Sequence, residues 1–294
     1  MVGSGYMKYE TKELTSVTRS KLPGNFIKLT DGHTHYELLG SEKGDLIVLV
    51  HGFVTPYFAW DKQIEDFTKQ GFQVLRYDLF GRGFSDRPKK RYDNNLFVKQ
   101  LHELLVELNF QKHKIFLIGW SMGGAISLNF TKTYPEVVSK LILVAPIGLP
   151  SPGLSSALLF KIPLLRNIIF YNFGHKIMSK RIKSVLQIED INSDEFKKVV
   201  EQMEYKGFLK ALLLTGTQMN VYHLEDVYKE VGKIEMAKML IWGEVDGSVS
   251  FKLHTKVIEY LPGIIFHPMK DIGHAPQYTN SSKFNELVLK FIKD

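Results

Sequence analysis

At 294 residues, the chain is long enough to bury a sizeable core in one large domain or two small ones. Apolar residues make up 44% of it and charged residues 23%, which excludes a disordered, fibrous or membrane-spanning composition. The net charge of +7 is a modest excess for this length, so we expect solvated surface and no nucleic-acid partner. Cysteine is absent, which excludes disulfides, cysteine-ligated zinc and thiol catalysis.

Two segments bear on where the protein works. Residues 1–10 lack the apolar core of a secretory leader, and the absence of cysteine is compatible with the cytoplasm, so we expect a cytoplasmic protein. The apolar tract at 154–173 is interrupted by a proline, an asparagine and two basic residues. These interruptions argue against a transmembrane helix.

Short β-rich runs alternate with helical patterns along the first half of the chain. Strands at 26–29 and 33–39 are expected to form a hairpin around Asp31-Gly32. The apolar run at 46–50 is typical of a strand that is buried on both faces of a parallel sheet. The pattern then predicts helix 60–70, strand 73–77, helix 96–108, strand 115–118, a helix to about residue 134, and strand 141–144.

The alternation stops at Pro146 and resumes late in the chain. Residues 147–228 show helical patterns without such strands, whereas strand 239–242, helix 251–260, strand 264–267 and a last helix to Lys293 restore the alternation. Such alternation predicts an α/β fold, with a mostly parallel sheet and helices on both faces. We predict a core of residues 21–146 and 229–294, a helical insertion at 147–228 and an N-terminal extension at 1–20.

The stretch LIGWSMGGA, residues 117–125, places Ser121 between Gly119 and Gly123 where a predicted strand gives way to a helix. A serine at such a sharp turn has a strained backbone, and side chains two residues away would collide with the neighbouring strand and helix. Its hydroxyl would stand at the carboxyl edge of the sheet, where open α/β sheets bind ligands. We predict that Ser121 is a nucleophile; the alternative is a glycine-rich turn with an incidental serine.

A nucleophilic serine needs a histidine base that a carboxylate orients, each on a later loop. For the acid, Asp246 is favoured over Glu244, which lies closer to the strand end, and over Asp271, which lies close before the histidine. For the base, His274 alone among ten histidines lies on a late loop in the required order. Other histidines lie on predicted strands or helices: His33, His35, His254 and His267.

Acyl transfer also needs donors for the developing oxyanion. We expect them to be the backbone N–H groups of Met122, the residue after the nucleophile, and of Phe53, in the loop after strand 46–50. The Phe53 ring would either wall an acyl pocket or belong to the core. This chemistry needs no metal or other cofactor, and a metal pair at His33 and His35 would lack further ligands.

These residues resemble the landmarks of the α/β-hydrolase fold family. The matching stretches follow the family's order: LVHGF (49–53), YDLFGRGFSDRP (77–88), LIGWSMGGAISL (117–128), WGEVD (242–246) and IGHAP (272–276). The resemblance implies that the HG turn carries one oxyanion donor and that the GxGxS loop is architectural, so neither Arg82 nor Ser85 is given a catalytic role. It also implies that the insertion forms a helical lid over the active site.

Relatives within this family differ in chemistry. Dehalogenases and epoxide hydrolases use an aspartate nucleophile, and the turn HGFVTP departs from those of proline iminopeptidases and many carbon–carbon bond hydrolases. The chain is therefore most similar to carboxylesterases and monoacylglycerol-lipase-like enzymes. The apolar tract at 154–173 could line an acyl-chain pocket, touch a lipid interface or only pack the lid onto the sheet.

We therefore predict a serine hydrolase of carboxylic esters, with a small-molecule, lipid-like substrate of apolar acyl chain and an acyl-enzyme intermediate. A transient contact with a lipid interface is compatible with this function. Two alternatives stay open: a carbon–carbon bond hydrolase of diketone-type substrates, and a ligand receptor that retains the hydrolase fold.

Overall fold

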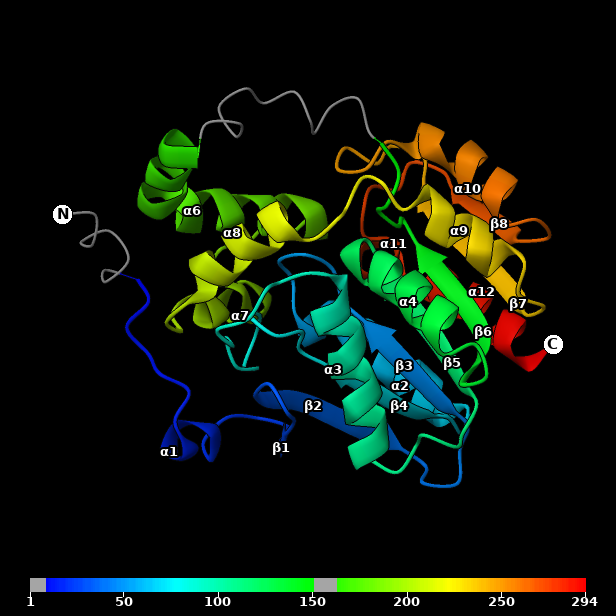
Figure 1. The fold of residues 1–294 in the computed structure, drawn as a ribbon, viewed down its shortest axis with the longest axis horizontal. Coiled ribbons are helices and arrows are strands. Elements are labelled where there is room, and N and C mark those ends of the chain that lie inside the picture. Colours follow the sequence, from blue (N-terminus) through cyan, green and yellow to red (C-terminus); the bar gives the residue numbers. More distant parts are fainter. Residues whose placement is uncertain (1–8, 151–162) are drawn as a thin grey trace.

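The computed structural model describes residues 9–150 and 163–294. The first eight residues of the predicted N-terminal extension lie outside this part, as do residues 154–162 of the apolar tract. Within it, one eight-stranded sheet has the order β1-β2-β4-β3-β5-β6-β7-β8 (Figure 1). The strands are β1 (Asn25–Lys28), β2 (His33–Gly40), β3 (Leu46–Val50), β4 (Gln73–Tyr77), β5 (Ile115–Trp120), β6 (Val138–Val144), β7 (Ala237–Gly243) and β8 (Ile265–Met269).

The sheet is mostly parallel, which confirms the predicted fold class. β1 pairs antiparallel with β2 and β2 with β4, while β4, β3, β5, β6, β7 and β8 pair in parallel. The β1–β2 hairpin closes around the predicted Asp31-Gly32 turn, with Lys28 opposite His33. Parallel strands end at the same edge of a sheet, so the loops after β3, β5, β7 and β8 can meet there.

Helices cover both faces of this sheet (Figure 1). One face carries α3 (Asn94–Glu107), α4 (Met122–Thr133), α9 (Glu225–Gly232) and α10 (His254–Tyr260); the other carries α2 (Asp61–Lys69), α11 (Pro276–Thr279) and α12 (Ser281–Lys293). In β3, Val48 and Val50 enter the first of these two cores, and Ile47 and Leu49 enter the second. Burial on both faces explains the unbroken apolar run of this strand.

Among the described residues, three further helices lie between β6 and β7 in the sequence: α6 (Pro163–Leu186), α7 (Asp194–Met203) and α8 (Phe208–Gln218). They pack on one another and form a separate group beyond one end of the sheet (Figure 1). A buried glutamine of α7, Gln202, donates to the carbonyl of Val54 over 3.1 Å and so ties this group to the loop after β3. The insertion boundary expected after Tyr228 falls inside α9, which packs on α4 and α10.

The N-terminal segment before α1 (Ser16–Arg19) lies along these inserted helices. The Glu10 carboxylate is buried and accepts hydrogen bonds from the backbone N–H groups of Gly207, at 2.6 Å, and Leu209, at 2.9 Å. Lys12 forms a β-bridge with Tyr205. The segment is therefore attached to the start of α8 through both a side chain and the backbone.

Two short 3-10 helices complete the described elements, η2 (Tyr57–Trp60) and η3 (Phe251–Leu253). None of the helices in the described part is long and apolar enough to cross a membrane. Over the same residues, no cluster of three or more histidine, aspartate or glutamate side chains could hold a metal ion.

Candidate active site

Ser121 lies at a tight turn between β5 and α4. Its backbone angles are φ 55° and ψ −114°, a strained conformation for a residue with a side chain. A Cβ at Gly119 would lie 2.4 Å from the carbonyl oxygen of Gly123, and a Cβ at Gly123 would lie 2.1 Å from that of Val50. Both distances are far below a van der Waals contact, so the predicted steric role of the two glycines is confirmed.

His274 and Asp246 meet Ser121 in one hydrogen-bonded chain. The distance from Nε2 of His274 to Oγ of Ser121 is 3.0 Å, and that from Nδ1 of His274 to Oδ2 of Asp246 is 2.7 Å. His274 lies in the loop between β8 and α11, and Asp246 in the loop after β7. The other two acids considered, Glu244 and Asp271, are exposed, and neither is hydrogen-bonded to His274.

Donors fix the carboxylate of Asp246 on both oxygens. Oδ1 accepts from the backbone N–H groups of Ser248, at 2.7 Å, and Val249, at 2.9 Å, and Oδ2 accepts from the indole of Trp242 at 3.0 Å. An acceptor in this position requires the proton of His274 on Nδ1. Nε2 is then left to accept the hydroxyl proton of Ser121.

Two backbone N–H groups beside Ser121 are free. Those of Phe53 and Met122 donate no hydrogen bond to any described residue. Met122 follows the serine as the first residue of α4, where a helix leaves its N–H groups unpaired. These are the two groups that the sequence predicts as oxyanion donors, and their role stays a prediction.

A cavity of about 40 Å³ opens on Ser121 and His274, which are 7% and 8% exposed. Its lining residues are Phe53, Val54, Thr55, Trp120, Ser121, Arg181, Ile182, Val185 and His274. A cavity needs about 10–15 Å³ to hold one water molecule, so this one has room for about three waters or a short acyl group. Because three of the lining residues come from α6, a longer substrate requires side chains of that helix to move.

A larger hollow of about 250 Å³ lies between the N-terminal segment and the start of α8. Its lining residues are Glu13, Leu14, Asp86, Arg87 and Lys206. Glu13 is paired with Lys206, and Asp86 with Arg19. This larger hollow shares no lining residue with the cavity at Ser121. Its greater volume is therefore no reason to place the chemistry there.

Comparison with known proteins supports the same architecture. Residues 45–166 match the model of the α/β hydrolase fold family. A bromoperoxidase from Bacillus anthracis superposes with a TM-score of 0.78 at 22% identity, over 92% of this chain and 100% of that one. An esterase from Exiguobacterium antarcticum gives 0.75 at 20% identity, over the same shares. The chain has the α/β-hydrolase fold.

Among curated relatives, the hydrolase is similar to a 2-hydroxy-6-oxononadienedioate/2-hydroxy-6-oxononatrienedioate hydrolase of a Pseudomonas species, with 24% identity over 91% of this chain and 95% of the relative. It is also similar to the AB hydrolase superfamily protein YisY of Bacillus subtilis, with 25% identity over 91% and 98%. The turn HGFVTP therefore does not separate this hydrolase from relatives of the first kind.

His51 supports the loop that carries Phe53. It is fully buried, and its Nε2 accepts the backbone N–H of Leu79 over 3.0 Å, while Nδ1 lies 2.8 Å from the carbonyl oxygen of Gly52. These partners require an unprotonated Nε2 and a protonated Nδ1. Burial lowers the pKa of His51 from 6.5 to about 4, so the ring is neutral near pH 7.

Arg82 lies beneath the same loop. Its guanidinium is fully buried, with Nε 3.0 Å from the carbonyl oxygen of Phe53 and Nη1 3.1 Å from that of Phe80. Nη2 lies 4.0 Å from Sδ of Met122. Burial lowers the pKa of Arg82 to about 9, which still leaves it charged at neutral pH.

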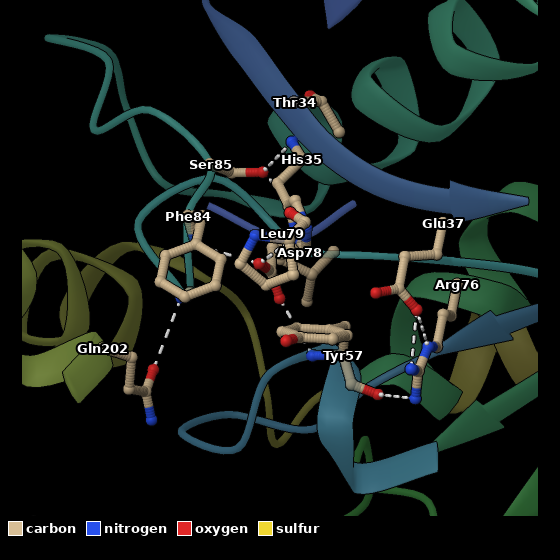
Figure 2. Close-up of polar contacts among 12 residues, drawn as sticks. Thr34, His35, Glu37, Tyr57, Arg76, Asp78, Leu79, Phe84, Ser85 and Gln202 are labelled. Atoms are coloured by element: carbon tan, nitrogen blue, oxygen red, sulfur yellow. Dashed lines mark hydrogen bonds and ion pairs between the residues drawn. The ribbon is translucent and has the colours of Figure 1, made fainter. Parts of the chain in front are cut away.

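A buried ion pair, which the sequence did not reveal, holds the GxGxS loop (Figure 2). Nδ1 of His35 lies 2.7 Å from Oδ2 of Asp78, and its Nε2 lies 3.0 Å from the carbonyl oxygen of Pro23. Two acceptors require two ring protons, so His35 is a cation. Burial alone would raise the pKa of Asp78, but the charge and hydrogen bond of His35 outweigh it and lower the pKa.

The same carboxylate binds two backbone segments. Asp78 accepts from the N–H groups of Tyr57 and Phe84, both at 2.9 Å, and its own carbonyl accepts from the hydroxyl of Ser85 at 2.6 Å (Figure 2). Asp78 thus joins β2, the GxGxS loop and the start of η2. Its position directly after a buried strand was the one signal in the sequence that could have drawn attention to it.

Proposed function

We propose that this hydrolase cleaves carboxylic esters through an acyl-enzyme on Ser121. The observation that carries the proposal is the hydrogen-bonded chain from Ser121 through His274 to Asp246, beside the free N–H groups of Phe53 and Met122. A nucleophile, a base, an orienting acid and oxyanion donors are the complete set that acyl transfer requires.

In the proposed reaction, Oγ of Ser121 attacks the ester carbonyl as Nε2 of His274 takes its proton. Asp246 stabilises the imidazolium, and the N–H groups of Phe53 and Met122 bind the oxyanion, each worth about 100-fold to 1,000-fold in rate. The alcohol leaves with the proton from His274. Water then attacks the acyl-enzyme with His274 as the base, which releases the acid and restores Ser121.

The substrate proposed is a small ester with an apolar acyl chain. Apolar side chains of Val54, Trp120, Ile182 and Val185 line the cavity and support this choice. Exposed Phe173 on α6 offers an apolar contact for a lipid interface. The test compares kcat/KM along a series of aryl esters; higher values for acetyl than for octanoyl esters would contradict an apolar chain.

The assignment of Ser121 has a direct test. Labelling by a fluorophosphonate and ester hydrolysis should both be lost in Ser121→Ala. The control is Ser41→Ala, which removes an exposed hydroxyl beyond β2 and should keep both signals. Retention of labelling by the Ser121→Ala variant would show that the nucleophile lies elsewhere.

A second candidate is hydrolysis of a carbon–carbon bond. It is favoured by the relatives named for 2-hydroxy-6-oxononadienedioate, which contains no ester, so that its hydrolysis must break a bond between carbons. A solved meta-cleavage product hydrolase from Pseudomonas fluorescens also superposes, with a TM-score of 0.73 at 21% identity. Turnover of such a dienoate without activity on simple esters would favour this candidate; labelling of Ser121 with no turnover at all would favour a receptor.

A further inference from the structure

A basic side chain on α6 lines the cavity beside Ser121. Arg181 belongs to the cavity wall, whereas Lys180 and Lys183, its basic neighbours on the same helix, do not. Within the described part of the chain, the Arg181 guanidinium has no hydrogen bond and no ion pair. Its donors are therefore available to a ligand.

The surroundings of Arg181 do not neutralise its charge. The other two residues of α6 in the wall, Ile182 and Val185, are apolar, and no carboxylate is among the described lining residues. Asp246 lies behind His274 with both oxygens already bonded. The charge of Arg181 acts on Tyr222: burial raises the pKa of this tyrosine, and Arg181 lowers it.

The chemistry of a guanidinium selects its partner. It presents two parallel N–H donors that match the two oxygens of a carboxylate. Arg181 is exposed, so its guanidinium can be reached by a ligand that enters the cavity from solvent. Arg181 and Ser121 line the same cavity of about 40 Å³, so the anion must lie within a few bonds of the carbonyl that Ser121 attacks.

We propose that Arg181 binds a carboxylate on the substrate, so that the preferred ester is short and carries one carboxylate at the far end of an otherwise apolar chain. This inference rests on the proposed reaction at Ser121. The carboxylate can belong to the acyl part, as in the monoester of a dicarboxylic acid, or to the alcohol part, as in an ester of a hydroxy acid. Both present the same anion to Arg181, and separate substrates distinguish them.

The experiment compares charged and neutral esters of the same shape. For the acyl part, the pair is monomethyl pentanedioate and methyl 5-methylhexanoate, in which an isopropyl group replaces the carboxylate. For the alcohol part, the pentanoyl ester of 4-hydroxybutanoate is compared with that of 4-methylpentan-1-ol. The measured quantity is the ratio of kcat/KM for the charged ester to that for its neutral partner.

In Arg181→Met, this ratio should fall at least tenfold for one of the two pairs, mainly through a higher KM for the charged ester, and Arg181→Lys should restore part of it. Lys180→Met removes the same charge from the neighbouring side chain, which is exposed like Arg181 but lies outside the cavity, and should keep the wild-type ratio. Ratios that are unchanged in Arg181→Met, or that fall equally in Lys180→Met, would overturn the inference.

A binding measurement separates this inference from the proposed function. Calorimetry on Ser121→Ala should detect binding of pentanedioate, and adding Arg181→Met should weaken that binding at least tenfold. If Ser121→Ala binds pentanedioate equally well with and without Arg181→Met, Arg181 does not bind the carboxylate, whatever reaction the protein catalyses. If the wild-type protein shows neither labelling nor ester hydrolysis, the proposed function at Ser121 is refuted. The calorimetry would still show whether Arg181 binds a carboxylate.

Discussion

Arg82 donates from Nε to the carbonyl oxygen of Phe53 over 3.0 Å. The same guanidinium reaches Sδ of Met122 at 4.0 Å, so one buried cation contacts both residues proposed as oxyanion donors. No carboxylate pairs with it among the described residues. Arg82 is therefore a positioning residue, and its charge also favours negative charge developing nearby.

Replacing this guanidinium should affect the chemical step more than substrate binding. We expect Arg82→Met to lower kcat by about 10-fold to 100-fold with little change in KM, since the Phe53 N–H is no longer held in place. Arg82→Lys keeps the charge and should recover part of the loss. Arg91→Met, at an exposed position, is the control. A loss confined to KM, or a loss matched by general unfolding, would contradict this role.

His51 should make the fold sensitive to acid. Its pKa is about 4 in the folded chain against an ordinary 6.5, so its contribution to stability is present above pH 6.5 and is lost as pH falls towards 4. At about 1.4 kcal/mol per pH unit, the loss amounts to about 3 kcal/mol. Urea unfolding of wild type and His51→Asn at pH 7 and pH 4 measures it. The difference in unfolding free energy between the two proteins should shrink at pH 4; a constant difference would refute the prediction.

Gly123 should not tolerate even a methyl group. The added Cβ of Gly123→Ala would lie 2.1 Å from the carbonyl oxygen of Val50 and 2.6 Å from that of His51, and neither backbone can move without disturbing β3. We expect a loss of at least about 100-fold in kcat/KM and a lower melting temperature. Gly247→Ala meets no atom within 4 Å and serves as control. Wild-type activity in Gly123→Ala would contradict this prediction, because it would show that the turn can move enough to accept the added methyl group.

The pair of His35 and Asp78 should be far more costly to break than a surface pair. Asp78→Asn leaves the His35 cation buried without its partner, and we expect a loss of about 3 to 5 kcal/mol in unfolding free energy. The exposed pair of Lys283 and Glu286 should contribute less than about 0.5 kcal/mol. Double-mutant cycles by urea unfolding measure both pairs. Similar coupling energies would argue against a charged, structural His35.

Local pattern was enough to place the elements that hold the site. Strands 46–50 and 73–77 have the predicted boundaries. In strand 46–50, burial on both faces gives an uninterrupted apolar run, which is a clear signal in the sequence. The order of Ser121, Asp246 and His274 along the chain was also sufficient to propose their meeting, since parallel strands deliver their loops to one edge.

Contacts between distant segments could not be read in the same way. His35 and Asp78 are 43 positions apart, and each lies in a pattern that an ordinary strand or loop also shows. The guanidinium of Arg82 reaches back 29 positions to Phe53. Periodicity indicates which face of a helix or strand is buried. Which polar groups pair depends on which distant segments lie next to one another in the folded chain.

The hydrogen bonds of Glu10 to the start of α8 link the inserted helices to the N-terminal segment. Any displacement of α8 away from the sheet must either carry residues 10–12 with it or break their bonds to Tyr205, Gly207 and Leu209. A force applied to residues 10–12 is therefore transmitted to α8, one of the three inserted helices. A spectroscopic label at Tyr9, exposed beside that anchor, would report substrate entry from a point outside the reaction centre.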